Sequence, residues 1–319
     1  MAKAKPPLTG GKRVLAIFLK SFIGLGTLFL AAELAVMAYP PLVLAGLAAF
    51  GRTPMCSTTD VLRGADQYYK QQQLREKIAA GTKLKQDDKA GFRLWSTPAG
   101  EFWNPSSSDG VLPVIVAQQE GNLYNLDGRG VQPGNIVIDC GAHIGLYTRR
   151  ALRDGAKLVV AIEPAPDNLE CLRRNLKAEI AAGKVIVVPK GVWDKEENLP
   201  FYENPENSAG DSFVGEPSKA KLKGILPLTT IDKLAAELKL ERVDFIKMDI
   251  KGAVAKALVG GRGVIAAHHP RLAISTEESV DDPVSVASAV DRLGLGYKAL
   301  CGSCTLVNGA VSPDVLFFR

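Results

Sequence analysis

Charge is scarce in this chain of 319 residues, and that scarcity excludes one class of protein. The formal net charge is only +5, and five basic residues precede the first acidic residue, Glu33. The rest of the chain is therefore close to neutral. It lacks the strongly basic face or stripe that nucleic-acid binding requires, so we expect no nucleic-acid partner.

Cysteine is also scarce, with five residues in all. The number is odd, and Cys140 and Cys171 fall in segments whose apolar pattern predicts burial. A disulfide framework is therefore not expected, and a reducing compartment fits best. Cys301 and Cys304 form a C-x-x-C pair, but no second pair accompanies it. We expect two packed thiols there rather than a metal site or a redox centre.

The chain lacks the G-x-G-x-x-G fingerprint of dinucleotide-binding proteins. Residues 135–152 read NIVIDCGAHIGLYTRRAL, in which only Gly141 and Gly145 are present. The missing third glycine disfavours an oxidoreductase that uses a dinucleotide, because those glycines let backbone amides approach a pyrophosphate. The turn carries a carboxylate instead, Asp139, which suits a ligand with a positive group such as an amino-acid ammonium.

A long apolar run is present near the start. Residues 21–39 read SFIGLGTLFLAAELAVMAY, about the ~20 residues needed to cross a bilayer as a helix. This run exceeds the roughly 7–15 residues of a signal-peptide core, and no convincing cleavage site follows it. We expect a membrane anchor at residues 1–50, a linker helix at residues 51–91 and a catalytic domain at residues 92–319.

Beyond residue 92 the pattern alternates between apolar runs and helical periodicity. A hairpin is expected around FRLWSTPAGEFWNP, and buried strands are expected at residues 135–139, 158–163, 184–189, 243–248 and 271–275. The C-terminal segments suit an antiparallel hairpin with a turn at Asn308–Gly309. Alternating strands and helices predict an α/β fold with a doubly wound, Rossmann-like and mainly parallel sheet.

The second expected strand ends in VVAIEP, which places Glu163 roughly twenty residues beyond the glycine turn. An acid at this position can accept hydrogen bonds from ribose hydroxyls, and ligands of such sheets bind at the carboxyl ends of the strands. A ligand with a ribose and an ammonium but no pyrophosphate is S-adenosylmethionine. Asp139 or Glu163 alone could be an ordinary strand-end residue or a helix cap, but together they favour this cofactor.

Four segments, VIDCGAHIGLYT, AIEPAPDNLECLRRNL, LTTIDKL and VDFIKMDIKGA, resemble in order and spacing the FkbM-type methyltransferases. The resemblance covers about residues 92–319. It implies a class I methyltransferase fold, S-adenosylmethionine as cofactor, and methylation of hydroxyl oxygens on small molecules, sugars or related natural products. By position, the family's cofactor loop and its ribose-binding acid correspond to Asp139, Gly141, His143, Gly145 and Glu163.

The resemblance also places Asp249 on the acid that ends the family's fourth strand. We expect this residue to be the catalytic base, the other interpretation being a cap for the next helix near Gly252. The family usually has two glutamates just beyond, where this chain has Lys251 and Val254. The alternative to an active enzyme is therefore a methyltransferase-like binding or scaffold protein that has lost catalysis.

The orientation in the membrane follows from the cofactor. S-adenosylmethionine is made in the cytosol, so we expect the catalytic domain to face the cytoplasm and to methylate a small-molecule, sugar or lipid-linked substrate. The basic N-terminus favours a cytoplasmic start, however, and one crossing would then export the domain. Either a re-entrant hairpin broken at Pro40 and Pro41, or a first helix inserted with its N-terminus outside, removes this conflict.

Overall fold

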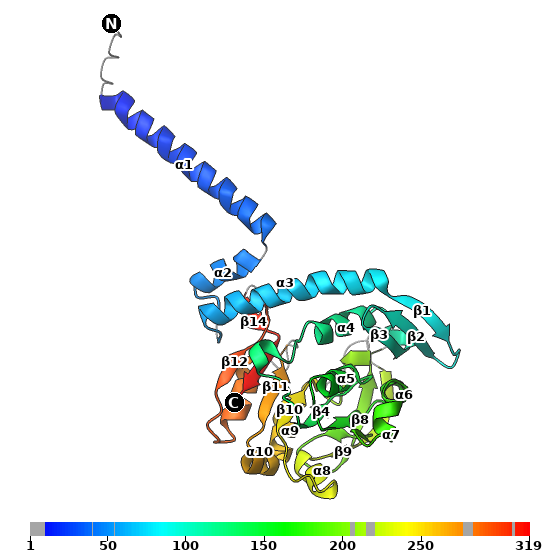
Figure 1. The fold of residues 1–319 in the computed structure, drawn as a ribbon. Helices are drawn as coiled ribbons and strands as arrows, with labels where there is room; N and C mark the ends of the chain where they lie inside the picture. Colours follow the sequence, from blue (N-terminus) through cyan, green and yellow to red (C-terminus); the bar gives the residue numbers. More distant parts are fainter. Residues whose placement is uncertain are drawn as a thin grey trace.

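A seven-stranded sheet forms the centre of the fold in the computed structural model, which describes residues 10–39, 41–53, 55–204, 208–214, 221–276, 283–307 and 310–319 (Figure 1). The order of its strands is β12-β15-β11-β10-β4-β5-β6. The parallel strands are β4 (Ile136–Cys140), β5 (Leu158–Ile162), β6 (Val185–Val188), β10 (Phe245–Met248) and β11 (Arg271–Ser275). The predicted doubly wound α/β sheet is confirmed.

The last strand reverses direction at the edge of this sheet. β15 (Val315–Phe318) pairs antiparallel with both β11 and β12 (Ala299–Cys301). The predicted antiparallel C-terminal strands are therefore present. Between them, β13 (Cys304–Val307) and β14 (Ala310–Pro313) form a separate two-stranded sheet, and the turn expected at residues 308–309 lies outside the described residues.

Helices cover both faces of the central sheet, because successive strand residues point to opposite sides. Ile138 and Ile246 pack on one face, and their neighbours Val137 and Phe245 pack on the other; all four are at most 1% exposed. The first face is covered by α8 (Ile231–Glu237), α9 (Val254–Gly260), α10 (Arg262–His268) and α11 (Pro283–Asp291). The second is covered by α5 (Leu146–Arg153), α6 (Pro166–Asn175) and residues 123–131, and α7 (Lys177–Ala181) follows α6. Burial on both faces explains why the strands read as continuous apolar runs.

Smaller elements flank the central sheet. The predicted hairpin is present as β2 (Phe92–Thr97) and β3 (Gly100–Pro105), which β1 (Lys83–Asp87) extends to three antiparallel strands. A second small sheet contains β7 (Gly191–Val192), β8 (Asn198–Glu203) and β9 (Lys221–Thr229). The remaining elements are α4 (Leu112–Glu120) and the short helices η1 (Ser106–Ser108), η2 (Leu126–Gly128) and η3 (Ser208–Gly210).

Three helices precede these sheets. α1 (Gly10–Ala38) projects away from the rest of the molecule (Figure 1), and within the described chain it alone is long and apolar enough, over Lys20–Ala38, to cross a membrane. This finding rests on length and composition. α2 (Pro41–Ala49) instead buries Leu44 and Ala48 in the core of the globular domain. Because Leu44 and Ala48 are used there, this packing favours α2 as part of the globular domain over α2 as the second leg of a membrane hairpin.

The expected linker helix is α3 (Thr58–Gly81), and it packs along the domain rather than standing free. Its start is capped by the Ser57 side chain, which accepts a hydrogen bond from the Asp60 amide at 3.2 Å. Val61, Ala65 and Ile78 are at most 1% exposed, so one face of the helix is fully covered. The position of α3 is therefore fixed relative to the central sheet.

A disulfide joins the start of this helical region to the sheet. Cys56 and Cys301 are bonded across 245 residues of sequence, so the expectation of no disulfide is wrong for this pair. Cys140, Cys171 and Cys304 are free and buried. The C-x-x-C pair thus contains one bonded cysteine and one packed thiol, and the bonded one comes from β12 while its partner precedes α3.

Replacing Cys56 with serine should lower the free energy of unfolding by about 2–5 kcal/mol, because a cross-link over so long a loop restricts the unfolded chain. Urea unfolding followed by tryptophan fluorescence measures the change. Tris(carboxyethyl)phosphine is the control: it should reproduce the loss in the native protein and leave the Cys56→Ser protein unchanged. Equal urea midpoints for the two oxidised proteins would contradict this expectation.

Candidate functional site

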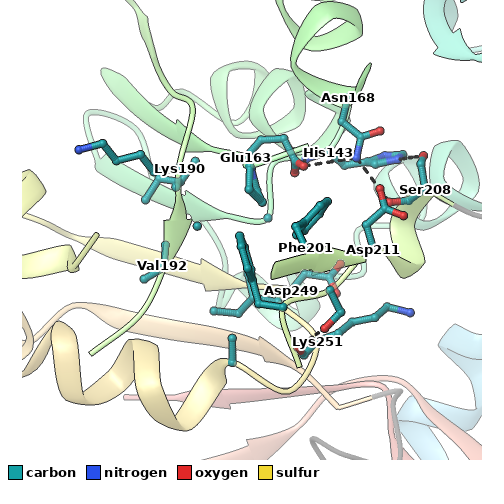
Figure 2. Close-up of a pocket in the computed structure, with 18 residues that line it drawn as sticks. His143, Glu163, Asn168, Lys190, Val192, Phe201, Ser208, Asp211, Asp249 and Lys251 are labelled. Carbon is teal, nitrogen blue, oxygen red and sulfur yellow. Dashed lines mark hydrogen bonds between the residues drawn. The ribbon is translucent and has the colours of Figure 1, made fainter. Parts of the chain in front are cut away.

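A cavity opens at the carboxyl ends of β4, β5 and β10, where the chain leaves each strand. Its lining includes Gly141, His143, Glu163, Asp249 and Lys251 (Figure 2). Neighbouring parallel strands end at the same edge of a sheet, so residues distant in the sequence meet there. The lining therefore combines the glycine turn with the two acids that follow β5 and β10.

The glycine turn is shaped by close contact with the next strand end. Gly141 has a φ of +77°, and a Cβ at this position would lie 2.2 Å from the Asp249 carbonyl oxygen. Gly145 has a φ of +86°, and a Cβ there would meet Leu176 at 2.7 Å. Only glycine fits both positions without displacing a neighbour. Gly141 lines the cavity, whereas Gly145 lets the turn pack against α6 and does not line it.

Glu163 is held by the backbone of the turn that it faces. One carboxylate oxygen accepts a hydrogen bond from the His143 amide at 2.8 Å, and the other accepts from the Ala165 amide at 3.0 Å. The side chain is 5% exposed. Burial raises the pKa of Glu163, and the two backbone hydrogen bonds act in the opposite direction. These bonds fix the orientation of the carboxylate while it lines the cavity.

His143 contributes its side chain to the same wall. Its Nε2 lies 2.8 Å from the Ser208 hydroxyl, as Figure 2 shows. Burial lowers the pKa of His143 to about 4, so the imidazole is neutral at pH 7. The neutral ring can hold Ser208 and η3 against the cavity without introducing a positive charge.

Asp139 does not line the cavity, which corrects the expectation that it contacts a ligand directly. Its carboxylate is fully buried, accepts a hydrogen bond from the Thr148 hydroxyl at 2.7 Å and pairs with Lys247 at 3.1 Å. Lys247 also donates to the Gly141 carbonyl at 2.7 Å. Burial alone would lower the pKa of Lys247, but Asp139 and Asp249 raise it above its ordinary value. Asp139 thus positions the glycine turn through Lys247.

Asp249 faces the cavity with a partly exposed carboxylate, 46% accessible. The Tyr124 hydroxyl donates to its Oδ2 at 2.9 Å, and Lys247 Nζ lies 4.0 Å from the same oxygen. The interpretation of Asp249 as a helix cap is wrong, because α9 begins at Val254 and its N-cap residue is Ala253. The carboxylate is therefore oriented and accessible, as a proton acceptor must be.

The two positions that depart from the family pattern have different surroundings. Lys251 lines the cavity, and its carbonyl accepts a hydrogen bond from the Ser212 hydroxyl at 3.2 Å. Val254 is 1% exposed and belongs to the main hydrophobic core. Only the change at Lys251 therefore alters the cavity lining.

Sequence reasoning missed part of the opposite wall. Phe201 comes from β8, and Ser208, Asp211 and Phe213 come from residues 208–214. Burial raises the pKa of Asp211 to about 7. Figure 2 shows Asp211 close to His143 and Ser208, with Phe201 between them and the Asp249 side. This stretch carries no motif, and only the path of the chain beyond β8 brings it to the cavity.

Gly141→Ala should destabilise the protein by about 1–3 kcal/mol more than Gly294→Ala. Both glycines have a φ above +70°, so both substitutions strain the backbone by about 1–2 kcal/mol. Only Gly141 has a carbonyl oxygen in the path of the new methyl group, whereas Gly294 has nothing within 4 Å. Thermal unfolding of the two variants measures the difference, and equal losses would show that the turn has room to move.

Comparison with known proteins connects this geometry to a family. Among solved structures, the chain is similar to the methyltransferase FkbM from Methylobacillus flagellatus KT, with 18% identity, a TM-score of 0.46, and coverage of 80% of this chain and 59% of that chain. It is also similar to the magnesium protoporphyrin IX methyltransferase from Synechocystis PCC 6803, with 13% identity, a TM-score of 0.34, and coverage of 66% and 78%.

Among curated proteins, the chain is 30% identical over 176 residues to the AMB antimetabolite synthetase AmbE of Pseudomonas aeruginosa. The match covers 43% of this chain and only 8% of that much longer protein. Residues 139–291, which contain the glycine turn, Glu163 and Asp249, match the methyltransferase FkbM domain. Residues 139–291 of this chain therefore form a methyltransferase FkbM domain.

Proposed function

We propose that this chain is a membrane-anchored O-methyltransferase in which Asp249 accepts the proton of an acceptor hydroxyl. The observation that carries the proposal is the position of Asp249, which lines the cavity opposite Glu163 with an accessible carboxylate. Tyr124 holds one of its oxygens by a hydrogen bond. A fixed, accessible carboxylate is what general-base catalysis requires.

The lining fits S-adenosylmethionine in its chemistry. Glu163 is the residue to accept hydrogen bonds from ribose hydroxyls, and Gly141 is the residue that lets the backbone pass close to the cofactor. Ile162, Val192 and Phe201 supply apolar surface suited to an adenine ring. His143 and Gly145 support this wall, and Asp139 positions it through Lys247. When bound, the cofactor supplies an activated methyl group.

The work left to the protein is to align the acceptor and remove its proton. The acceptor oxygen forms a bond to the methyl carbon as the bond from that carbon to sulfur breaks, and the hydroxyl proton passes to Asp249. Much of the rate enhancement then comes from positioning the oxygen in line with the breaking bond. The acceptor that we propose is a hydroxyl on a small molecule, a sugar or a lipid-linked compound. The small net charge of +5 disfavours nucleic acid.

A second candidate is a binding or scaffold protein that has lost catalysis, and the cation at Lys251 favours it. Lys251 lines the cavity where the family usually has an acid. Binding of S-adenosylmethionine with no methyl transfer to any lipid, glycan or small-molecule extract would support this alternative. Methyl transfer by both the native protein and the Lys251→Glu variant would rule out this alternative.

Two matched substitutions test the proposed enzyme. Asp249→Asn should leave the affinity for S-adenosylmethionine within about twofold and lower turnover by roughly 10²–10⁴-fold, because it removes the base and keeps the shape. Glu163→Gln should instead weaken cofactor binding, since its carboxylate is placed for the ribose. Calorimetry of the full chain in nanodiscs measures both affinities. No binding of S-adenosylmethionine to the native protein at millimolar concentration would refute the proposal. Loss of folding in Asp249→Asn would show that Asp249 stabilises the fold rather than acting as the base.

We also propose that the catalytic domain faces the cytoplasm, where its cofactor is made. With α2 packed on the domain, this requires α1 to insert with its N-terminus outside, against a small charge bias. The bond between Cys56 and Cys301 argues for an oxidising compartment. In a cytoplasmic domain the pair would be held as thiols, and the bond would form on oxidation.

A membrane-impermeant maleimide applied to intact cells tests this topology. Single cysteines are introduced at Lys12, in the first turn of α1, and at Lys221, in the exposed part of β9, in a protein whose Cys56 and Cys301 are serine. We expect labelling at residue 12 without permeabilisation, and at residue 221 only after permeabilisation. The reverse pattern would show that the domain is exported.

A further inference from the structure

A second cavity, of about 240 Å³, lies at the end of the central sheet over β11 and β15, the strands on the side of β10 away from β4 and β5. Its floor is formed at the end of β11 and the start of β15, where Thr276 and Asp314 lie. Its walls come from α3, α4 and the β13–β14 hairpin. In the sheet, β11 and β15 lie on one side of β10, and the cofactor cavity lies over β4 and β5 on the other.

The strand register places this second cavity next to the proposed base. Met248 pairs with Ile274, so Asp249 and Thr276 follow neighbouring strand ends. The Thr276 amide donates a hydrogen bond to the Asp314 carbonyl at 2.9 Å. This bond extends the pairing of β11 with β15 beyond the end of β11. With neighbouring strands ~4.8 Å apart, the backbones of Thr276 and Asp314 lie about 5 and 10 Å along the edge from Asp249. Asp249 does not line this cavity, so a ligand there would reach it only with a group that extends about 5 Å along the sheet edge from Thr276.

The second cavity is lined mainly by hydrogen-bonding groups, together with one cation, Arg75, and one acid, Asp314. Three glutamine amides face it together with hydroxyl groups of serine, threonine and tyrosine. Gln71 is 7% exposed, and its Nε2 has no hydrogen-bond partner among the described residues, although a buried donor without a partner is costly. Amides and hydroxyls both donate and accept hydrogen bonds, as ligand hydroxyl groups do. Arg75 and Asp314 carry opposite formal charges, so the lining has no excess charge that favours an ionic ligand of either sign.

An apolar groove of about 470 Å³ continues from this cavity toward the anchor. The cavity and the groove share Tyr68, Gln72 and Thr305. The far end of the groove is lined by residues of α2, among them Val43 and Leu44. Figure 1 shows α2 and α3 beside β14, with α1 leading away from α2. The lining thus changes from apolar beside the candidate membrane helix to polar beside Asp249.

We propose that the groove and the second cavity together take a neutral, hydroxylated lipid as the methyl acceptor. The apolar chain lies between α2 and α3, and the head group occupies the cavity lined by Gln71, Thr276 and Asp314. One head-group hydroxyl then reaches Asp249. This inference rests on the proposed function, because it names the acceptor of the same reaction. A glycosyl diacylglycerol has the required chemistry: an uncharged head rich in hydroxyl groups on an apolar tail.

The test uses the full chain in phosphatidylcholine nanodiscs that contain monoglucosyl diacylglycerol with a photoactivatable diazirine in its acyl chain. After irradiation, mass spectrometry identifies the labelled peptides. We expect label on the peptides that contain Val43 and Tyr68, and at least a fivefold decrease when unlabelled glucosyl lipid competes. Diacylglycerol without the sugar should compete at least fivefold less well. Label confined to α1, or equal competition by both lipids, would overturn the proposal.

The chain offers a matched pair of groove variants. Leu42 and Val43 are adjacent in α2 and 41% and 42% exposed, but only Val43 lines the groove. Val43→Lys should lower labelling of the Tyr68 peptide at least fivefold, and Leu42→Lys should leave it within twofold. Gln71→Leu should remove the advantage of the glucosyl lipid over diacylglycerol, because it deletes the unpartnered amide. Equal effects of the two lysine variants would contradict the assignment of the groove.

Calorimetry with S-adenosylmethionine on the same nanodiscs separates this inference from the proposed function. Binding of the cofactor without selective lipid labelling refutes the lipid acceptor and leaves the methyltransferase intact. Failure to bind the cofactor refutes the proposed function, and with it the role of the lipid as acceptor. Selective labelling together with transfer of a tritiated methyl group to the glucosyl lipid supports both.

Discussion

The buried ion pair between Asp139 and Lys247 is the interaction on which the site depends. The two residues face each other in the register of β4 and β10, and they are 0% and 2% exposed. Removing one partner of such a pair typically costs about 3–5 kcal/mol, because the other charge stays buried without compensation. Lys247 also holds the Gly141 carbonyl and lies near Asp249. One cation therefore fixes two strand ends and the turn between them.

The two acids of the cofactor cavity gain their orientation from this arrangement. Gly141 is in direct contact with the Asp249 backbone, and the same turn continues to His143, whose amide binds Glu163. The Glu163 carboxylate is held by main-chain amides and the Asp249 carboxylate by the Tyr124 hydroxyl, both at the ends of rigid strands. Such a site loses little entropy when it orders a ligand, which is how positioning contributes to catalysis.

The N-terminal helices and the sheet edge form a second packed unit. α3 lies over β13 and reaches α4, and the bond between Cys56 and Cys301 ties its start to β12. α3 is therefore fixed to the same edge that carries Thr276 and Asp314.

The sequence by itself determined the parallel strands, the hairpin at residues 92–105 and the placement of Glu163 and Asp249 at strand ends. These features depend on local apolar runs and on short motifs, which a linear pattern records. The tertiary structure alone decided that Asp139 turns inward to Lys247, because the register of β4 against β10 joins residues more than a hundred positions apart. It likewise decided the Cys56–Cys301 bond, the packing of α2 on the domain and the arrival of Asp211 at the cavity. Each of these is a contact between distant segments, and its energy comes from burial and pairing that no single segment contains.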